Sequence, residues 1–160
     1  MTIVADTSVI HYAVLIGIVE VIFDLYGQIL IPSAVHVELT DVGAPIGLRY
    51  WLERNLDRVE IRSVLVPDDP FLRNLDEGEM EAIFLAQQIP DSLLLIDDRD
   101  GRKEAKRRGL RISGLLGVIR NAALAGYLDF DDAMNKLKAT DFRLSAEVEG
   151  VVRAQYDSER

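Results

Sequence analysis

The chain has 160 residues, a length that fits one ordinary domain built on a single hydrophobic core. It carries 18 Lys and Arg against 27 Asp and Glu, and the formal net charge of −9 excludes a surface that coats nucleic acid through basic charge alone. A hydrophobic fraction of 49% with 28% charged residues excludes a disordered composition and allows a sizeable core.

The absence of cysteine excludes disulfides, thiol nucleophiles and zinc–thiolate sites, and it suits a reducing compartment. The apolar stretch Val9–Phe23 is interrupted by His11 and Glu20, so it lacks the uncharged run of about 18 residues that a membrane span needs. No positively charged segment precedes an apolar one, and Asp6 stands near the start, so we expect no signal peptide. We therefore expect a cytoplasmic protein with no membrane partner.

Short, continuous apolar runs predict strands that are buried on both faces, and such strands form parallel sheets covered by helices. In chain order the predicted strands are Ile3–Ala5, Ile29–Ile31, Val59–Val64, Leu93–Ile96 and Leu110–Ser113. The predicted helices between and after them are Ser8–Asp24 (one bent helix, or two broken near Gly17), Ser33–Thr40, Ile46–Asn55, Glu77–Gln88, Gly101–Arg108 and Leu115–Leu128, with two more within Phe130–Tyr156. This order predicts an α/β fold, a three-layer α/β/α sandwich with a central parallel sheet and extra C-terminal helices.

Acidic residues follow two of the predicted strands. Asp6 ends the first strand, and Asp97 and Asp98 follow the fourth. Right-handed crossovers place the carboxyl ends of parallel strands on one edge of the sheet, where ligands bind. The alternative is that these residues only cap the helices that follow, because Asp, Thr and Ser accept amide hydrogen bonds at helix N-termini.

Two glutamates fall on the apolar stripes of predicted helices. On helical wheels Glu38 and Glu79 point inward, whereas Glu81 points outward. A buried carboxylate needs a partner, which is either an arginine such as Arg99 or Arg102, or a cation shared with Asp6 and Asp97. Neither stripe carries a basic residue, so we favour the cation, and ligands that are all oxygen select Mg²⁺ or Mn²⁺. His11 and His36 are expected to be ordinary helix residues.

Basic residues gather directly after the acids of the fourth strand. They are Arg99, Arg102, Lys103, Lys106, Arg107, Arg108 and Arg111. They can line a cleft and bind a phosphate backbone, or they can form a solvated helix face that pairs with Asp100 and Glu104. The aromatic segment Tyr50–Leu52 is expected to lie in the core or in a homodimer contact.

Together these segments resemble the PIN domain, the nuclease fold shared by VapC-type toxins, and are most similar to its orphan VapC-like family. The resemblance runs from the first strand to about Leu128, through Asp6-Thr7-Ser8, Glu38, Gly78-Glu79-Met80-Glu81-Ala82, Leu94-Leu95-Ile96-Asp97-Asp98 with Gly101-Arg102 and Ala105, Gly109-Leu110 and Gly114-Leu115-Leu116-Gly117. It implies a PIN-like nuclease domain over residues 1–128 and a helical extension over 129–160, packed on the same domain.

The resemblance implies a ribonuclease that depends on Mg²⁺ or Mn²⁺, as the toxin of a toxin–antitoxin pair, with an antitoxin protein as partner and a homodimeric state. It implies catalytic acids and metal ligands at Asp6, Glu38, Glu79 and Asp97, with Asp98 as a further ligand. Ser8 would lie beside the metal, and Arg99 and Arg102 would bind phosphate.

Two positions depart from the family pattern. Most toxin members have Asp where Glu79 stands, and the usual Thr-x-Asp of the late strand reads Ile96-Asp97-Asp98, which leaves the choice between the two aspartates open.

Other functions were weighed against the residues. A catalytically inactive PIN-like module that binds a protein or RNA predicts the loss of at least one acid, and none is lost. A phosphoacceptor receiver domain needs an acid pair after the first strand and a lysine after the last, which Arg111-Ile112-Ser113 does not supply. A haloacid-dehalogenase-type phosphatase needs Asp-x-Asp at the first strand, where Ser8 occupies the second place.

Overall fold

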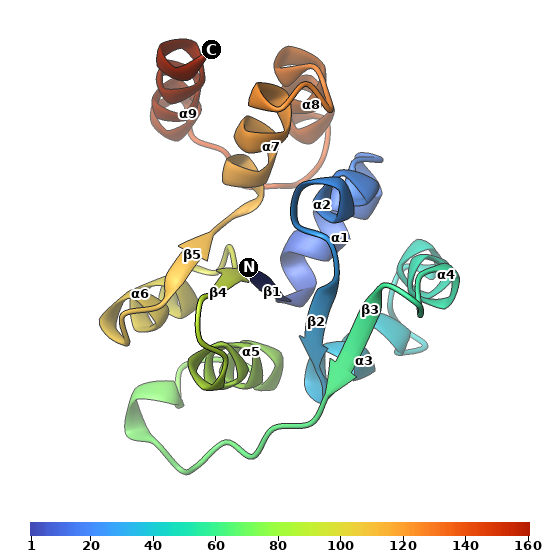
Figure 1. Cartoon of the computed structure of the whole chain (residues 1–160), viewed down its shortest axis with the longest axis vertical. Coiled ribbons are helices and arrows are strands. Elements are labelled where there is room, and N and C mark those ends of the chain that lie inside the picture. Colours follow the sequence, from blue (N-terminus) through green and yellow to red (C-terminus); the bar gives the residue numbers. More distant parts are fainter.

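The computed structural model describes all 160 residues, and its centre is a five-stranded parallel sheet (Figure 1). The strand order is β3-β2-β1-β4-β5, with β1 in the middle. The strands are β1 (Thr2–Ala5), β2 (Ile29–Pro32), β3 (Val59–Arg62), β4 (Ser92–Leu95) and β5 (Arg111–Ser113). The predicted α/β architecture with a central parallel sheet is therefore confirmed.

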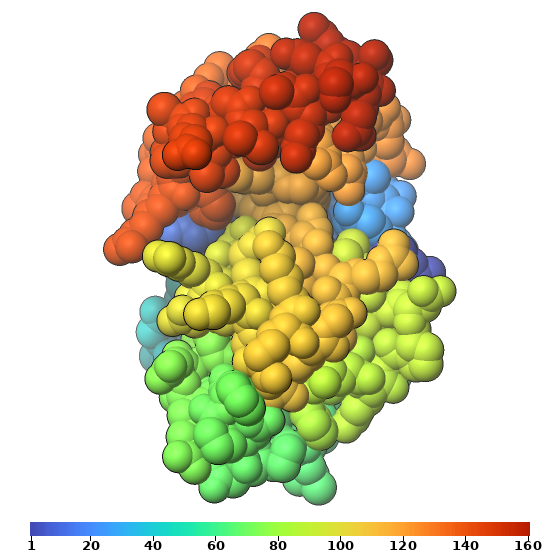
Figure 2. Space-filling view, turned by 90° about the vertical axis from the view of Figure 1, so that its left-hand side faces the viewer, coloured from blue at the N-terminus to red at the C-terminus, as the bar shows by residue number.

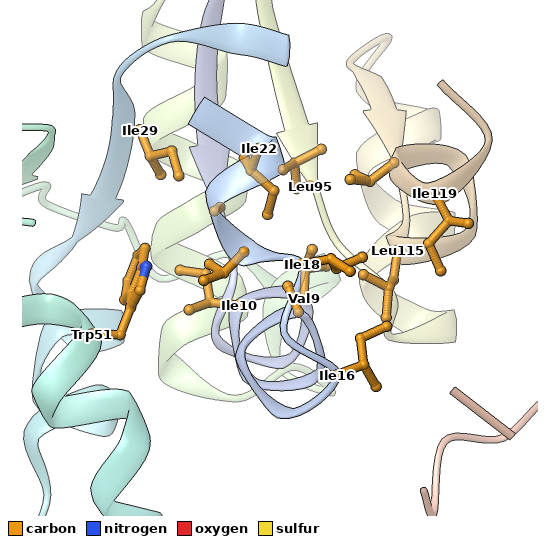
Figure 3. Packing of buried hydrophobic residues seen from close by; sticks show 14 of the residues in the cluster. Val9, Ile10, Ile16, Ile18, Ile22, Ile29, Trp51, Leu95, Leu115 and Ile119 are labelled. Carbon is orange, nitrogen blue, oxygen red and sulfur yellow. The ribbon is translucent and has the colours of Figure 1, made fainter. Parts of the chain in front are cut away.

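Alternate strand residues face opposite layers of helices. Val4, Leu30 and Leu94 pack with α5 (Glu77–Gln88) and α6 (Arg99–Arg107). The neighbouring residues of the same strands join a larger core of 27 buried residues, part of which Figure 3 shows. This core contains side chains from α1 (Thr7–Leu15), α2 (Val19–Tyr26), α3 (Ser33–Thr40), α4 (Ile46–Arg54) and α7 (Leu115–Leu124). The continuous apolar runs in the sequence thus reflect strands that are covered on both faces.

The apolar N-terminal segment is divided at Gly17, whose φ of 78° lies in the left-handed region that favours glycine. The axes of α1 and α2 differ by 118°. Each helix buries its own apolar residues, including Val9, Ile10 and Ile22 (Figure 3). No single helix of the chain is long and apolar enough to cross a membrane; only α1 and α2 taken together reach that length and composition.

The C-terminal helices share the main core. Helix α8 (Phe130–Lys138) contributes Phe130, Met134 and Leu137, and α9 (Ala146–Glu159) contributes Val152. The two predicted helices are therefore present and pack on the α/β unit, while a boundary at residue 128 stays a prediction.

The aromatic segment of α4 serves the core. Trp51 is 6% exposed and stacks on Phe23, with their ring centroids 6.0 Å apart. Tyr50, the preceding residue of α4, is exposed. The core interpretation of Trp51 is therefore confirmed.

Candidate active site

Asp6 is a buried carboxylate at the carboxyl end of the central strand. Its backbone N–H donates to the Leu95 carbonyl at 3.0 Å, which continues the pairing of β1 with β4, and the residue is 4% exposed. Asp6 occupies the N-cap position of α1, but its side chain makes no capping hydrogen bond. Burial raises the pKa of Asp6 to about 7, and the charges of Asp76, Glu38 and Asp98 add to the effect. Helix capping therefore does not explain this residue.

Glu38 reaches the same region from α3. Its Oε2 atom accepts a hydrogen bond of 2.5 Å from the Thr7 hydroxyl, and burial raises the pKa of the carboxyl. At Gly78 in α5, the position of an added Cβ would overlap Glu38 Oε1. Only a glycine thus allows α5 to approach this carboxylate so closely. The inward orientation predicted for Glu38 agrees with the structure.

Glu79 and Asp76 form a capping box at the start of α5. Asp76 Oδ1 accepts from the Glu79 N–H at 2.8 Å, and Glu79 Oε2 accepts from the Asp76 N–H at 3.2 Å. Burial, together with the charges of Asp76, Asp6 and Asp98, raises the pKa of Glu79 to about 8. Asp76 was missed in the sequence, although the spacing Asp-x-x-Glu is the signature of a capping box.

Glu81 corrects one prediction. The helical wheel placed it outward, but it is half-buried, and its Oε1 atom accepts a hydrogen bond of 3.0 Å from the Ala34 N–H. The neighbouring helix α3 lies against this face of α5, so the carboxylate binds a free amide in the first turn of α3. A wheel for one helix does not show where a second helix packs.

Asp97 and Asp98 point to different partners. Both oxygens of Asp97 lie 3.2 Å from the Leu115 N–H at the start of α7. Burial raises the pKa of Asp97, while this N–H and the nearby Arg102 lower it. Asp98 caps α6 by accepting from the Gly101 N–H at 2.8 Å, yet its charge raises the pKa of Asp6 and Glu79. The capping interpretation therefore holds for Asp98.

Gly114 precedes α7 and lies against Asp97. An added Cβ there would overlap Asp97 Oδ1 and would meet Arg102 Nη1 at 3.0 Å. This is the second place in the site where the absence of a side chain lets a carboxylate approach the backbone.

Glu79, Asp97 and Asp98 border a cleft of about 810 Å³, whereas Asp6 and Glu38 do not line it. It is lined by Ser8, Tyr12, Glu79, Asp97, Asp98, Arg99, Asp141, Phe142 and Arg143. In Figure 2 the orange-red segment near residue 140 and the yellow segment near residue 100 rise on either side of a recess with blue N-terminal atoms behind. The sequence did not predict that residues 141–143 line this cleft, because no local pattern indicates that the segment after α8 packs against α1.

The basic residues after Asp98 divide into two groups. Arg102 Nη1 donates to the Ile96 carbonyl at 3.0 Å, and Arg99 lies in the cleft. Arg107 and Arg108 instead bind Glu104, and Arg108 also binds Asp69 at 2.7 Å. For Arg107 and Arg108 the structure therefore agrees with the second alternative, a helix face that pairs with Glu104.

The donor chemistry of the site fits a hard divalent cation. All candidate ligands are oxygen atoms, Asp6 is buried with no basic partner, and the buried Ser8 Oγ has no hydrogen-bond partner. No group of three or more acids or histidines, however, is close enough together to hold an ion. The expected convergence of Asp6, Glu38, Glu79 and Asp97 around one ion is thus absent from this arrangement, and their roles as ligands stay predictions.

Comparison with known proteins agrees with this fold. A family model described as a PIN domain matches residues 2–158. One solved structure, a PilT N-terminus domain protein from the hyperthermophilic archaeon Sulfolobus solfataricus, is 20% identical, with a TM-score of 0.51 over 81% of this chain and 95% of that one. No curated protein matches. The chain belongs to the PIN domain family, whose members are generally metal-dependent nucleases.

Proposed function

We propose that this protein is a ribonuclease that hydrolyses RNA phosphodiester bonds with Mg²⁺ or Mn²⁺. The observation that carries the proposal is the pair of partly or fully buried carboxylates Asp6 and Glu79, whose pKa values are raised to about 7 and about 8. Neither has a basic partner, whereas the buried carboxylate elsewhere in the chain, Glu104, has two. A group of acids that lowers stability in the absence of a cation is typical of a site built to bind one.

Asp6, Glu38 and Glu79, with Asp97 or Asp98, are the residues that would hold the metal. When bound, Mg²⁺ or Mn²⁺ activates water and neutralises the charge that builds on phosphate oxygens. The chain's own groups fix the acids: the Thr7 hydroxyl holds Glu38, the Asp76 N–H holds Glu79, and the Leu95 carbonyl holds the backbone of Asp6.

Arg99 and Arg102 would bind substrate phosphate. Arg99 lines the cleft, and both arginines border a second recess of about 380 Å³ beside Asp97. Their positive charge offsets part of the repulsion between an acidic protein and a polyanion.

The alternative is a catalytically inactive module that keeps the fold and binds a protein or RNA. Both proposals predict binding at this edge of the sheet, but only the nuclease requires a divalent cation. Purified protein should be incubated with a mixed RNA and with DNA, with Mn²⁺ or with a chelator. Cleavage of RNA only with the cation supports the ribonuclease, and its absence under all conditions supports the inactive module.

Point variants then assign the acids. We expect Asp6→Asn and Glu79→Gln to abolish cleavage, whereas Glu81→Gln retains it, because Glu81 binds the first turn of α3. Parental activity in the first two variants would contradict the assignment.

The resemblance to VapC-type toxins supports a finer proposal, in which the ribonuclease is a toxin that forms a homodimer and is blocked by an antitoxin protein. Growth arrest on expression of the parent, but not of Asp6→Asn, is the expected result. Sedimentation of the purified chain as a dimer tests the oligomeric state.

A further inference from the structure

The segment that joins α8 to α9 forms one rim of the acidic cleft. Its residues Asp141, Phe142 and Arg143 line the cleft together with Arg99, which begins α6. In Figure 2 the two segments stand on either side of the recess. One wall of the cleft is thus formed by the segment after α8, and not by residues at the carboxyl ends of the strands.

Contacts with α1 hold this irregular segment in place. The Tyr12 hydroxyl donates to Asp141 Oδ1 at 2.8 Å across 129 positions of sequence. The Tyr12 ring meets the Phe142 ring edge-on, with centroids 5.0 Å apart, and Phe142 packs against the main core. The Phe142 N–H donates to the Thr140 hydroxyl at 3.2 Å. The backbone that carries Arg143 is therefore anchored although it is neither helix nor strand.

Arg143 and Arg99 are exposed and form no ion pair, unlike Arg107 and Arg153. Arg153 binds Asp131 at 2.6 Å, and Arg107 binds Glu104 at 2.8 Å. In a chain of net charge −9, two unpaired guanidinium groups stand on the two sides of the cleft that contains the acids. Guanidinium groups bind phosphate through pairs of parallel hydrogen bonds.

We propose that Arg143 binds a backbone phosphate of the polynucleotide substrate from the rim opposite Arg99, so that the two arginines form a phosphate clamp, and that Tyr12 positions Arg143 through Asp141. This inference rests on the proposed nuclease function.

The test is binding of a fluorescent oligonucleotide to the full chain in a chelating buffer, measured by anisotropy at several salt concentrations. We expect Arg143→Ala to weaken the binding of single-stranded RNA roughly tenfold. The slope of log affinity against log salt should fall in magnitude by about 0.7, the value for one phosphate contact on a single strand. The matched control is Arg54→Ala, which removes another exposed, unpaired arginine at the end of α4 and should change affinity less than about twofold.

The outcomes separate the parts of the proposal. Equal affinities of Arg143→Ala and Arg54→Ala, or no binding by the parent, would overturn the phosphate clamp. Single-stranded DNA of the same sequence shows whether the clamp reads only the phosphates, in which case it binds as well as RNA, or the ribose also, in which case RNA binds more tightly; both results keep the clamp.

Kinetics separate the clamp from the nuclease function. If the parent cleaves RNA with Mn²⁺, Arg143→Ala should raise KM with little change in kcat, and an unchanged KM would refute the clamp but not the nuclease. If the parent never cleaves while Arg143→Ala still weakens binding, the nuclease function fails and the clamp stands.

Tyr12→Phe keeps the aromatic contact with Phe142 and deletes the hydrogen bond to Asp141. It should raise KM about threefold with an unchanged kcat and melting temperature. A fall in melting temperature without a change in KM would show a purely structural role for Tyr12.

Discussion

Asp6 and Glu104 are buried to nearly the same extent, at 4% and 7% exposure, but their surroundings are opposite. Glu104 binds Arg107 and Arg108, which lower its pKa. Asp6 has only other acids near it, and its pKa is raised to about 7. The charge of Glu104 is balanced within the chain, since it is paired with two arginines. Asp6 lacks a positive partner within the chain, and this lack supports the proposed binding of a cation there.

The largest expected effect is a loss of cleavage rate on substitution of the unpaired Asp6. Asp6→Asn should lower the rate of RNA cleavage at least about a hundredfold, because it removes a charged oxygen ligand from a site whose residues act together. The measurement is single-turnover cleavage with saturating Mn²⁺. Asp57→Asn, an exposed aspartate with no ion pair, is the matched control and should cleave at the parental rate. Equal rates for the two variants would remove Asp6 from the site.

Disruption of the ion pairs of Glu104 should change stability instead of the cleavage rate. Glu104→Gln removes one of the two carboxylates that bind the largely buried Arg108 side chain, so the free energy of unfolding should fall by about 2 kcal/mol. Urea denaturation measures this loss, with the exposed Glu53→Gln as control. Cleavage below the melting temperature should be unchanged, and a large loss of kcat in Glu104→Gln would contradict the separation of the two regions.

The raised pKa values of Asp6 and Glu79 also predict how stability depends on pH. The pKa values of Asp6 and Glu79 are raised in the folded chain, so their stabilising contribution is complete below about pH 4 and is lost as the pH rises through 7 to 8. Without metal, the free energy of unfolding should therefore fall between pH 5 and pH 8.5 by an amount on the order of 2 kcal/mol.

Urea midpoints in a chelating buffer test this dependence. Asp6→Asn should flatten it, and Mn²⁺ should raise the midpoint more at pH 8 than at pH 5, because the ion binds only the folded, ionised site. A stability that rises over this range without metal would mean that the acids have basic partners.

The smallest expected effect is a difference in RNA affinity between substitutions of two arginines of α6. Arg99→Ala should weaken RNA binding about fivefold, since Arg99 is unpaired in the cleft. Arg107→Ala should leave binding within about twofold, because this side chain already binds Glu104 and covers the Phe71 ring at 3.9 Å. Fluorescence anisotropy with one labelled RNA compares them directly, and a stronger effect of Arg107→Ala would show that its ion pair opens on binding.

The sequence allowed prediction of what depends on local pattern. The strands, the edge where Asp6 and Asp97 emerge and the inward orientation of Glu38 follow from apolar runs and helical periodicity. The partners of the charges could not be predicted, because they depend on packing between distant segments. Arg108 meets Asp69 across 39 positions, and Tyr12 meets Asp141 across 129.

The helical wheel also failed where a second helix packs against the residue it describes. Glu81 lies on the polar side of its own helix, yet α3 covers it. Asp76 could have been found from its capping-box spacing, but its closeness to Asp6 depends on how α5 docks on the sheet.

At Gly78 and Gly114 an added methyl group would overlap a carboxylate, that of Glu38 and that of Asp97, respectively. An alanine at either glycine would displace a carboxylate while leaving every acidic residue in the sequence. Under the proposed nuclease function, such a substitution would inactivate a relative without the loss of any acid. Surveys that judge the competence of such relatives should therefore inspect these two glycines together with the acids they accommodate.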